Sequence, residues 1–442
     1  MKNRTPGNVV NFMLLACPKL VGSFCILLGV SVAGFTQVKD SLPQPFATKS
    51  AINFSRAIGW KNGRTPTAPP GFKVTLYANG FENPRWMYVT SNGDILVAES
   101  NSNYNIWEQI AGTILGAAKS KNLSHSKDRI ILLRDTDKDG FPDFRDTFLT
   151  AKSGLEQPFG MLQIGNWLYV ANTNAILRYP YNPGDSKITA VAQKIADLPA
   201  GKHNKHWTKN IITNAGQSKL YVAIGSASNA LGHGINEEIL RACILEMNLD
   251  GTGQRVYADG LRNPVGMDWA PGTNTLWTVV NERDRLGDDL VPDFFTSVKD
   301  GGFYGWPYVY WGQHRDPRVK DQELAKVKNT IIPDIDMGSH NACLGLAFYT
   351  KNKFPERYRN GAFIAEHGSS NRKVLSGYRV VFVPFKNGKP SGPPEDFLQG
   401  FIADLKKDRV YGRPVGVTLL PEGSMLVTDD FSNIIWRVDY GE

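Results

Sequence analysis

Cysteine and the common catalytic motifs are scarce in this 442-residue sequence. Its four cysteines are too few for a disulfide scaffold, and they form neither a C-x-x-C zinc pair nor a C-x-x-C-H haem attachment motif. The sequence also lacks G-x-x-x-x-G-K-[ST], G-x-G-x-x-G, G-x-S-x-G and H-E-x-x-H. These absences disfavour P-loop nucleotide chemistry, nicotinamide binding, serine hydrolysis and zinc proteolysis.

Runs of like charge are missing as well. Lysine and arginine total 50 against 42 acidic residues, a formal net charge of +8, but the basic residues form no run that would suit a nucleic acid. With 41% hydrophobic and 21% charged residues the composition is that of a globular protein. The 43 glycines, 26 prolines and 10 tryptophans favour many turns and aromatic-rich strands over a helical bundle.

One long apolar stretch stands at the N-terminus. Lys2 and Arg4 come first, and residues 20–33 are continuously apolar or small, a pattern typical of an export signal. We predict a signal peptide or uncleaved N-terminal anchor over residues 1–34, a linker over 35–67 and one domain over 68–442. The predicted location is periplasmic or extracellular, with membrane contact only through an uncleaved N-terminus.

The rest of the chain carries an imperfect repeat. A proline-containing turn leads into a short strand, a Gly or Asn turn, a second strand rich in Val and Ala, and usually a third strand ending in Arg. The six units begin near residues 83, 157, 206, 262, 344 and 412. Their mean length is about 65 residues, enough for a four-stranded propeller blade with loops.

We therefore predict an all-β fold, a six-bladed β-propeller. The last unit has three strands, so pairing of the N-terminal strand (72–78) with the C-terminal strand would complete it and hide both sheet edges. Two stacked sandwiches are the alternative, but they do not explain one recurring Pro-x-Gly unit. Residues 101–128 and 308–342 do not fit the unit, and we expect insertions there that wall a binding site.

In a propeller, the turn before each blade's first strand faces one end of the central tunnel. The corresponding residues here are basic or carry amides: Arg85, Gln157, His206, Arg262, Asn263, His340, Asn341 and Arg413. Like charges so close together repel unless an anion lies between them, so the pattern predicts a polyanionic ligand. Pairing of the arginines with Glu99, Glu156 and Glu282 is the alternative interpretation.

Several segments near these turns form longer motifs. They include His206-Trp207-Thr208-Lys209, the G-L-R-N-P-V-G segment at 260–266, G-G-F-Y-G-W-P at 301–307 and Y-G-R-P-V-G at 411–416. In these motifs, and over nearly all of residues 70–440, the chain resembles the soluble glucose/sorbosone dehydrogenase family, most strongly its sorbosone-dehydrogenase-like branch. The resemblance implies a six-bladed propeller quinoprotein that uses pyrroloquinoline quinone (PQQ), a tricarboxylate.

The resemblance also implies roles for single residues. His206 aligns with the catalytic base, and Arg262 with the arginine that polarises the quinone oxygens. The backbone carbonyls of the Glu282-Arg283-Asp284 loop align with those that hold a calcium ion beside PQQ. The family's cofactor-binding lysine has no counterpart here, and the segment that contains His367 and Arg372 takes its place. Together with residues of the tunnel, the predicted cofactor contacts are Arg85, Gln157, Asn263, His340, His367, Arg372 and Arg413.

The implied activity is oxidation of a sugar hemiacetal, an aldose or a hydrated aldehyde of the sorbosone or glucose type. Because no haem motif is present, electrons would pass to an external acceptor, a quinone or a cytochrome. Lys205 stands where glucose-type members carry an acid, which argues against glucose specificity. Two alternatives remain: a propeller lactonase or esterase with a metal on its axis, and a non-catalytic carbohydrate- or protein-binding propeller that has lost PQQ.

A separate pattern predicts a structural calcium site. The segment D-T-D-K-D-G-F-P-D at 135–143 carries carboxylates at alternating positions and a glycine where the loop must turn sharply. The predicted calcium ligands are Asp135, Asp137, Asp139 and Asp143. Strand-like sequences flank the loop, so it is not an EF-hand, and a solvated acidic turn is the alternative. Cys243 and Cys343 can be either free or bridged on the sequence alone.

Overall fold

The computed structural model describes residues 42–120, 123–320 and 323–441. Contacts divide the chain into two units, Met1–Leu42 and Pro43–Glu442. The predicted signal or anchor, residues 1–34, lies outside the described residues. Within the described ranges, no helix is both long enough and apolar enough to cross a bilayer.

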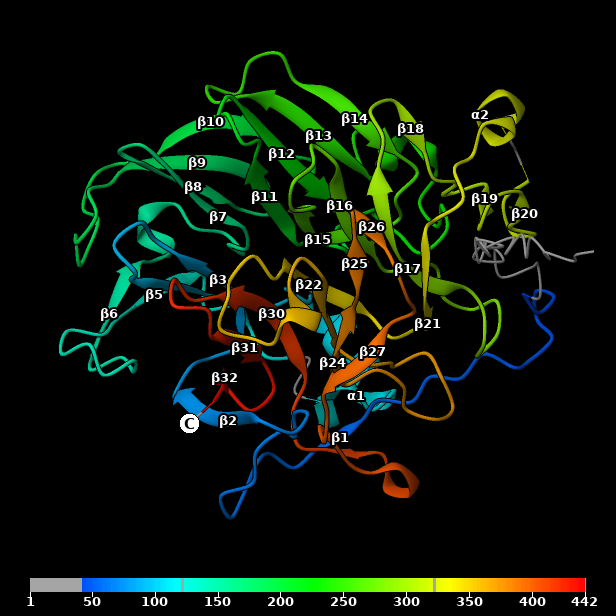
Figure 1. Ribbon diagram of the computed structural model, residues 1–442. Helices are drawn as coiled ribbons and strands as arrows, with labels where there is room; N and C mark the ends of the chain where they lie inside the picture. Colours follow the sequence, from blue (N-terminus) through cyan, green and yellow to red (C-terminus); the bar gives the residue numbers. More distant parts are fainter. Residues whose placement is uncertain (1–41, 121–122, 321–322, 442) are drawn as a thin grey trace, which may run out of the picture. The chain divides into compact units, whose positions relative to one another are not determined.

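Strands dominate the unit Pro43–Glu442, which confirms the predicted all-β class. The α-helices among the described residues are α1 (Ile106–Ile114) and α2 (Leu324–Lys328), and five short 3₁₀ turns accompany them. Six sheets of four or five strands carry most of the chain (Figure 1).

The first three large sheets follow the chain order. Sheet one contains β3 (Pro84–Val89), β4 (Ile95–Glu99), β5 (Arg129–Arg134) and β6 (Phe144–Leu149). Sheet two contains β7 (Met161–Ile164), β8 (Trp167–Ala171), β9 (Ala175–Pro180) and β10 (Gln193–Asp197). Sheet three contains β11 (Lys209–Thr213), β12 (Lys219–Ile224), β13 (Cys243–Asn248), β14 (Arg255–Asp259) and the parallel β18 (Gly302–Phe303).

The other three repeat the pattern. Sheet four contains β15 (Pro264–Trp269), β16 (Leu276–Val280), β17 (Pro292–Val298) and β21 (Ile335–Ser339). Sheet five contains β22 (Cys343–Phe348), β23 (Ala362–Glu366), β24 (Arg379–Val383) and β27 (Glu395–Leu398). Sheet six contains β30 (Pro414–Leu419), β31 (Met425–Asp429), β32 (Ile434–Tyr440) and β2 (Phe72–Ala78).

Smaller sheets lie in the connections. They are β1 (Arg56–Ala57) with β29 (Arg409–Val410) and β28 (Ile402–Asp404), β19 (Val309–Tyr310) with β20 (His314–Arg315), and β25 (Phe385–Lys386) with β26 (Lys389–Pro390).

The two ends of the sheet-forming chain pair as predicted. β2 runs antiparallel to β32, from Phe72 opposite Tyr440 to Leu76 opposite Trp436. In Figure 1 the blue β2 accordingly lies beside the red β32. The pairing supplies the fourth strand that the last repeat lacks.

The first strands of the six large sheets contact one another in a cycle, β3 to β7, β11, β15, β22, β30 and back to β3. Glycines of the repeat make this approach close. A Cβ on Gly160 would lie 2.5 Å from the backbone nitrogen of Ile211 in β11, and one on Gly266 would lie 2.5 Å from the carbonyl oxygen of Leu344 in β22. Because no side chain fits there, the Pro-x-Gly repeat is a requirement of strand packing.

Apolar clusters fill the space between consecutive sheets. β4, β16, β23 and β31 are buried at every residue, as expected for strands covered on both faces. One cluster joins Leu96 of β4 to Leu168 of β8 in the next sheet. Another joins Val97 of β4 to Leu426 of β31, so the first and last sheets also share a core.

Two segments differ from their expected form, 308–342 and 43–67, whereas 101–128 is an insertion as expected. The insertion 101–128 carries α1, whereas 308–342 also contains β21, a regular strand of sheet four. Residues 43–67, expected as a linker, belong to the compact unit: the Phe46 N–H donates to the Leu286 carbonyl at 2.6 Å, and β1 pairs with β29. The unit thus begins at Pro43, because the backbone groups of this segment find partners on the sheets.

Candidate active site

Four of the residues predicted at the turns of the repeat line one pocket of about 150 Å³. They precede the first strands of neighbouring sheets: His206 before β11, Arg262 and Asn263 before β15, and His340 before β22. The pocket is further lined by Asn281, Glu282, Asp284, Asp293, Ala342, Gly368, Ser370 and Asn371. Corresponding turns of the repeat therefore converge, as the sequence predicted.

His206 is held in one tautomer. Its Nδ1 lies 2.8 Å from the carbonyl oxygen of Ser226 and 3.0 Å from the Ser226 hydroxyl, which itself donates to the Ser228 carbonyl at 2.6 Å. Both neighbours are therefore acceptors, so Nδ1 carries the proton and Nε2 keeps a free lone pair. Burial, reinforced by the charges of Arg262 and Lys205, lowers the pKa of His206 well below 6.5, so the imidazole is neutral.

Asn263 lies next to this histidine with an unused acceptor. Its Oδ1 is buried and has no hydrogen-bond partner, although buried amides are nearly always satisfied. A Cβ on Gly225 would lie 2.3 Å from that oxygen and 2.4 Å from the His206 Cβ. Glycine at 225 therefore permits the two side chains to stand close together at the pocket wall.

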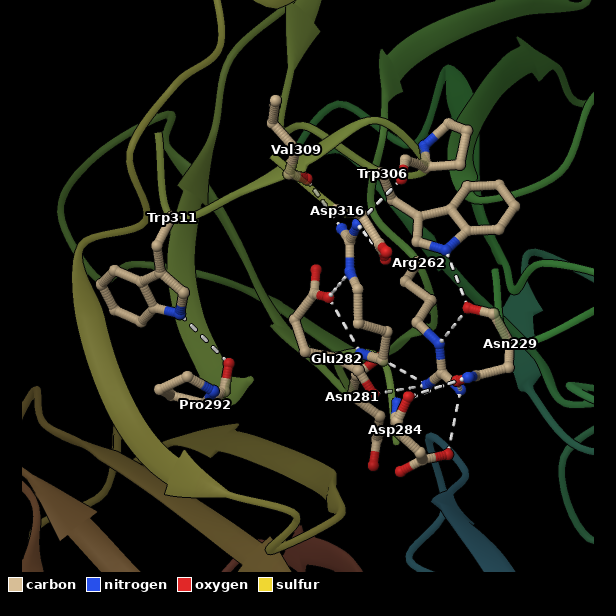
Figure 2. Close-up of polar contacts among 12 residues, drawn as sticks. Asn229, Arg262, Asn281, Glu282, Asp284, Pro292, Trp306, Val309, Trp311 and Asp316 are labelled. Carbon is tan, nitrogen blue, oxygen red and sulfur yellow. Dashed lines mark hydrogen bonds and ion pairs between the residues drawn. The ribbon is translucent and has the colours of Figure 1, made fainter. Parts of the chain in front are cut away.

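Arg262 is buried, and a cage of acceptors fixes its guanidinium (Figure 2). Its Nη1 donates to the carbonyls of Asn281 (3.1 Å) and Glu282 (2.7 Å), and its Nη2 to Asn229 Oδ1 (2.8 Å). Asp284 Oδ2 lies 3.3 Å from the same Nη2. The charge is held in place at the pocket wall.

The loop 282–284 makes several hydrogen bonds within the protein. The fully buried Arg283 pairs with Glu282 at 2.8 Å and donates to the carbonyls of Pro307 and Val309. The carbonyl of Glu282 accepts from Arg262, and that of Asp284 accepts from Arg318 at 2.7 Å. Since a carbonyl oxygen has two lone pairs, a calcium ion there would have to use the second one.

Asp284 itself lines the pocket through its carboxylate. His340 donates from Nε2 to the Gly287 carbonyl at 3.0 Å, and its Nδ1 lies 3.4 Å from Asp284 Oδ1. Burial opposes a charge on His340, but the hydrogen bond and charge of Asp284 outweigh it and raise the histidine's pKa. Burial likewise opposes ionisation of Asp284, yet His340 and Arg262 lower its pKa. The Asp284 carboxylate thus pairs with Arg262 and lies beside a histidine whose charged form it favours.

Arg85, Arg413 and His367 form a second cluster around Asp430. Arg413 Nε lies 3.1 Å from Asp430 Oδ1, His367 Nε2 lies 3.0 Å from Oδ2, and Arg85 pairs with the same Oδ2. Burial lowers the pKa of His367 to about 4, so it is neutral. Arg85 and Arg413 thus share the Asp430 carboxylate, and the neighbouring Asp429 carboxylate accepts the Arg413 N–H at 3.0 Å.

This second cluster adjoins the first pocket. His367 and Arg413 line a cavity of about 60 Å³ that shares Gly368 and Ser370 with the larger one. We expected the arginines to repel one another unless an anion lay between them. The structure corrects this expectation, because part of the balancing charge comes from Asp430, a residue that our sequence analysis missed. Asp430 follows the end of β31, and the ends of second strands also bear Glu99, Asn281 and Glu366, a recurrence that could have revealed it.

Gln157 and Arg372 are not among the residues that line either pocket. Gln157 Nε2 donates to the Asn101 carbonyl at 2.7 Å and thereby holds the start of the 101–128 insertion. Arg372 pairs with Asp289 at 2.6 Å. In this structure both side chains tie loops together.

The predicted calcium loop brings three of its four carboxylates together. Ligand oxygens of Asp135, Asp137 and Asp143 all lie within 4.8 Å of one another, whereas the Asp139 carboxylate accepts the Phe141 N–H at 2.8 Å. Asp135 Oδ2 accepts from the Gly140 N–H, and its buried Oδ1 has no hydrogen-bond partner.

Cys243 and Cys343 are both free and buried, which settles the question of a bridge between them.

The fold and the site can now be compared with known proteins. The unit is all-β, and the turns of its repeat bring together a neutral histidine, a caged arginine and an unsatisfied amide. The chain is a member of the TrAA12-like family, whose sequence profile matches residues 66–292 and 310–440.

Two sequence relatives extend over most of the chain. It is 30% identical over 390 residues to an uncharacterized protein of Borreliella burgdorferi, covering 85% of this chain and 91% of that protein. It is 22% identical over 372 residues to the pyrroloquinoline quinone-dependent sugar dehydrogenase of Hypocrea jecorina, covering 74% and 77%.

Solved structures share the fold. A Trichoderma reesei carbohydrate-active enzyme of family AA12 superposes with a TM-score of 0.67 at 19% identity, covering 88% of this chain and 99% of that one; it has also been solved as a calcium structure. The holo PQQ domain of Coprinopsis cinerea pyranose dehydrogenase has a TM-score of 0.64 at 17% identity, covering 87% and 100%.

Proposed function

We propose that this protein is a PQQ-dependent dehydrogenase that oxidises a sugar at a cyclic hemiacetal or hydrated aldehyde, the sorbosone type included. The observation that carries the proposal is His206, neutral and with Nε2 free, beside Arg262 in one pocket. The cycle of contacts among the first strands supports a closed six-bladed propeller as its scaffold.

The pocket residues fit an anionic quinone. Arg262 presents a fixed positive charge to the anion, and the unpartnered Asn263 Oδ1 beside Gly225 can accept a hydrogen bond from an N–H or O–H group of the ligand. The Arg85–Arg413–Asp430 cluster lies next to the pocket, and its guanidinium groups are of the kind that bind a carboxylate of the cofactor. Arg262, Asn263 and Arg413 are the residues that we propose hold PQQ.

When bound, PQQ would supply the two-electron acceptor that the side chains lack. His206 then accepts the proton of the substrate hydroxyl at Nε2, because its other nitrogen is committed to Ser226. Arg262 cannot turn away from the pocket, since five acceptors hold its guanidinium, and its charge stabilises negative charge that develops in front of it.

A lactonase or esterase reading is less well supported. Such an enzyme needs several side-chain oxygens on one catalytic metal, but among the described residues three acidic ligand atoms gather only in the Asp135 loop. In the pocket, Asp284 already pairs with Arg262 and lies beside His340. We assign the Asp135 loop a structural Ca²⁺, and we propose export and an external quinone or cytochrome acceptor.

The test is titration of the purified protein with PQQ, with and without Ca²⁺, followed by dye reduction across a panel of aldoses and hydrated aldehydes. We expect saturable PQQ binding at micromolar concentration and turnover of at least one sugar. PQQ binding without turnover of any sugar in the panel would contradict the proposed sugar oxidation. Absence of PQQ binding would refute the proposal in favour of the non-catalytic propeller that has lost PQQ.

A further inference from the structure

A segment without helix or strand, residues 46–55, leads to β1 and is drawn in blue in Figure 1. We call it the strap, because it joins two loops that adjoin the active site. Its first end is held by two hydrogen bonds. The Phe46 N–H donates to the Leu286 carbonyl at 2.6 Å, and the Thr48 hydroxyl oxygen accepts the Asp288 N–H at 2.9 Å.

The other end of the strap is fixed mainly by Asn53. Its N–H donates to the Ser370 carbonyl at 2.9 Å, and its side-chain amide donates to the Lys373 carbonyl and to Asp408 Oδ1, both at 2.9 Å. Ser370 lines the larger pocket, as does Asp284 at the start of the loop that holds the first end. The strap therefore spans from one side of the active site to another.

The last residues of the strap close the smaller cavity. Phe54 and Ser55 line this cavity together with Arg413 and His367. Ser55 is buried, and its carbonyl accepts from Ser120 Oγ at 2.5 Å. The strap thus supplies a wall on the side of the arginine cluster, where we propose that a carboxylate of the cofactor binds.

The size of the two cavities indicates that a wall must move. At about 150 and 60 Å³, both are smaller than the roughly 300–1,000 Å³ of a typical small-molecule site. The strap can move most easily, because residues 46–54 are exposed or half-buried and no strand pairing holds them. Arg413 and His367, in contrast, adjoin β30 and β23 of the large sheets.

We propose that the strap is a gate of the cofactor site: its hydrogen bonds hold it shut, and it opens to admit PQQ on the side of the arginine cluster. This inference rests on the proposed function. The strap lies outside residues 66–292 and 310–440, the ranges that match the family profile, so the profile does not describe this gate.

The experiment is stopped-flow measurement of PQQ association with the PQQ-free full-length protein, together with an equilibrium Kd for each variant. Asn53→Ala removes both side-chain hydrogen bonds of Asn53. Each lost bond should let the strap open roughly two- to tenfold more often. We therefore expect association at least about fourfold faster than in the parent, with a Kd no higher.

Two further variants accompany this measurement. Thr48→Val removes the acceptor of the Asp288 N–H and should also speed association. The matched control is Asn248→Ala, which likewise loses two side-chain hydrogen bonds, with Thr252 and Lys219, but lies outside the strap. Its association rate should equal that of the parent.

The outcomes separate the gate from the proposed function. PQQ binding at equal rates in the parent, Asn53→Ala and Thr48→Val would overturn the gate and leave the proposed function standing. A higher Kd with an unchanged association rate would also overturn the gate, because it would make the strap a structural support alone. Absence of PQQ binding in every protein would refute the proposed function and the gate together.

Discussion

Replacing Asp430 by Asn tests whether the arginine cluster is a balanced site for an anion. Asp430 is buried and accepts from Arg85, Arg413 and His367, and although burial opposes its ionisation, Arg413 and His367 hold its pKa far below the usual value. Removing one partner from a buried ion pair costs about 3–5 kcal/mol. We expect Asp430→Asn to destabilise the cofactor-free protein by this amount in urea unfolding.

The sign of the pH dependence follows from the same contacts. A carboxylate with a depressed folded-state pKa contributes stability that is present above its unfolded value of about 4 and is lost as the pH falls toward the folded value. Unfolding of Asp430→Asn should therefore depend less on pH below about 4 than unfolding of the parent.

The binding measurement distinguishes an anion site from a purely structural pair. Asp430→Asn removes one negative charge from the cluster, so added PQQ should raise the melting temperature more in the variant than in the parent. Glu237→Gln, which neutralises an exposed carboxylate, is the control and should change stability by less than about 0.5 kcal/mol. If the variant gains no more from PQQ than the parent, the cluster does not bind the cofactor.

Three further predictions concern the base, a buried lysine and the calcium loop. Ser226→Ala should lower kcat about 3–10-fold without changing PQQ affinity, because one acceptor at His206 Nδ1 is lost while the carbonyl remains; unchanged kcat would contradict this. Burial lowers the pKa of Lys209 to about 7, so stability should rise with pH between about 7 and 10. In Lys209→Met that slope should vanish and stability at pH 6 should rise by about 2–4 kcal/mol; a persisting slope would exclude Lys209. Chelation by EGTA should lower the melting temperature, with a loss of about 3 kcal/mol from a site held at a hundred times its Kd, and Asp137→Asn should be insensitive to EGTA.

Sequence reasoning was most effective where one physical requirement recurs. Gly160 and Gly266 recur because adjacent first strands touch backbone to backbone, so the repeat could be found without coordinates. The same periodicity placed His206, Arg262, Asn263 and His340 in one pocket. The periodicity did not predict β21 as the fourth strand of sheet four, because no turn signal links residues 335–339 to the other strands of that sheet.

The missed residues are those whose role depends on contacts between distant segments. Asp430 meets Arg85 across 345 positions of sequence, and Asn229 meets Asp284 across 55. The tautomer of His206 depends on Ser226, which stands at the end of another strand. Charge balance inside a site is set by such contacts, and the spacing of motifs along the chain does not encode them.

The central claim is that His206 is the base of a PQQ-dependent oxidation. The most direct measurement compares PQQ affinity and dye-coupled turnover of the parent and His206→Ala on a sugar that the parent oxidises. The account predicts turnover reduced by about 10²–10⁴-fold with PQQ affinity retained. Turnover equal to that of the parent would contradict it.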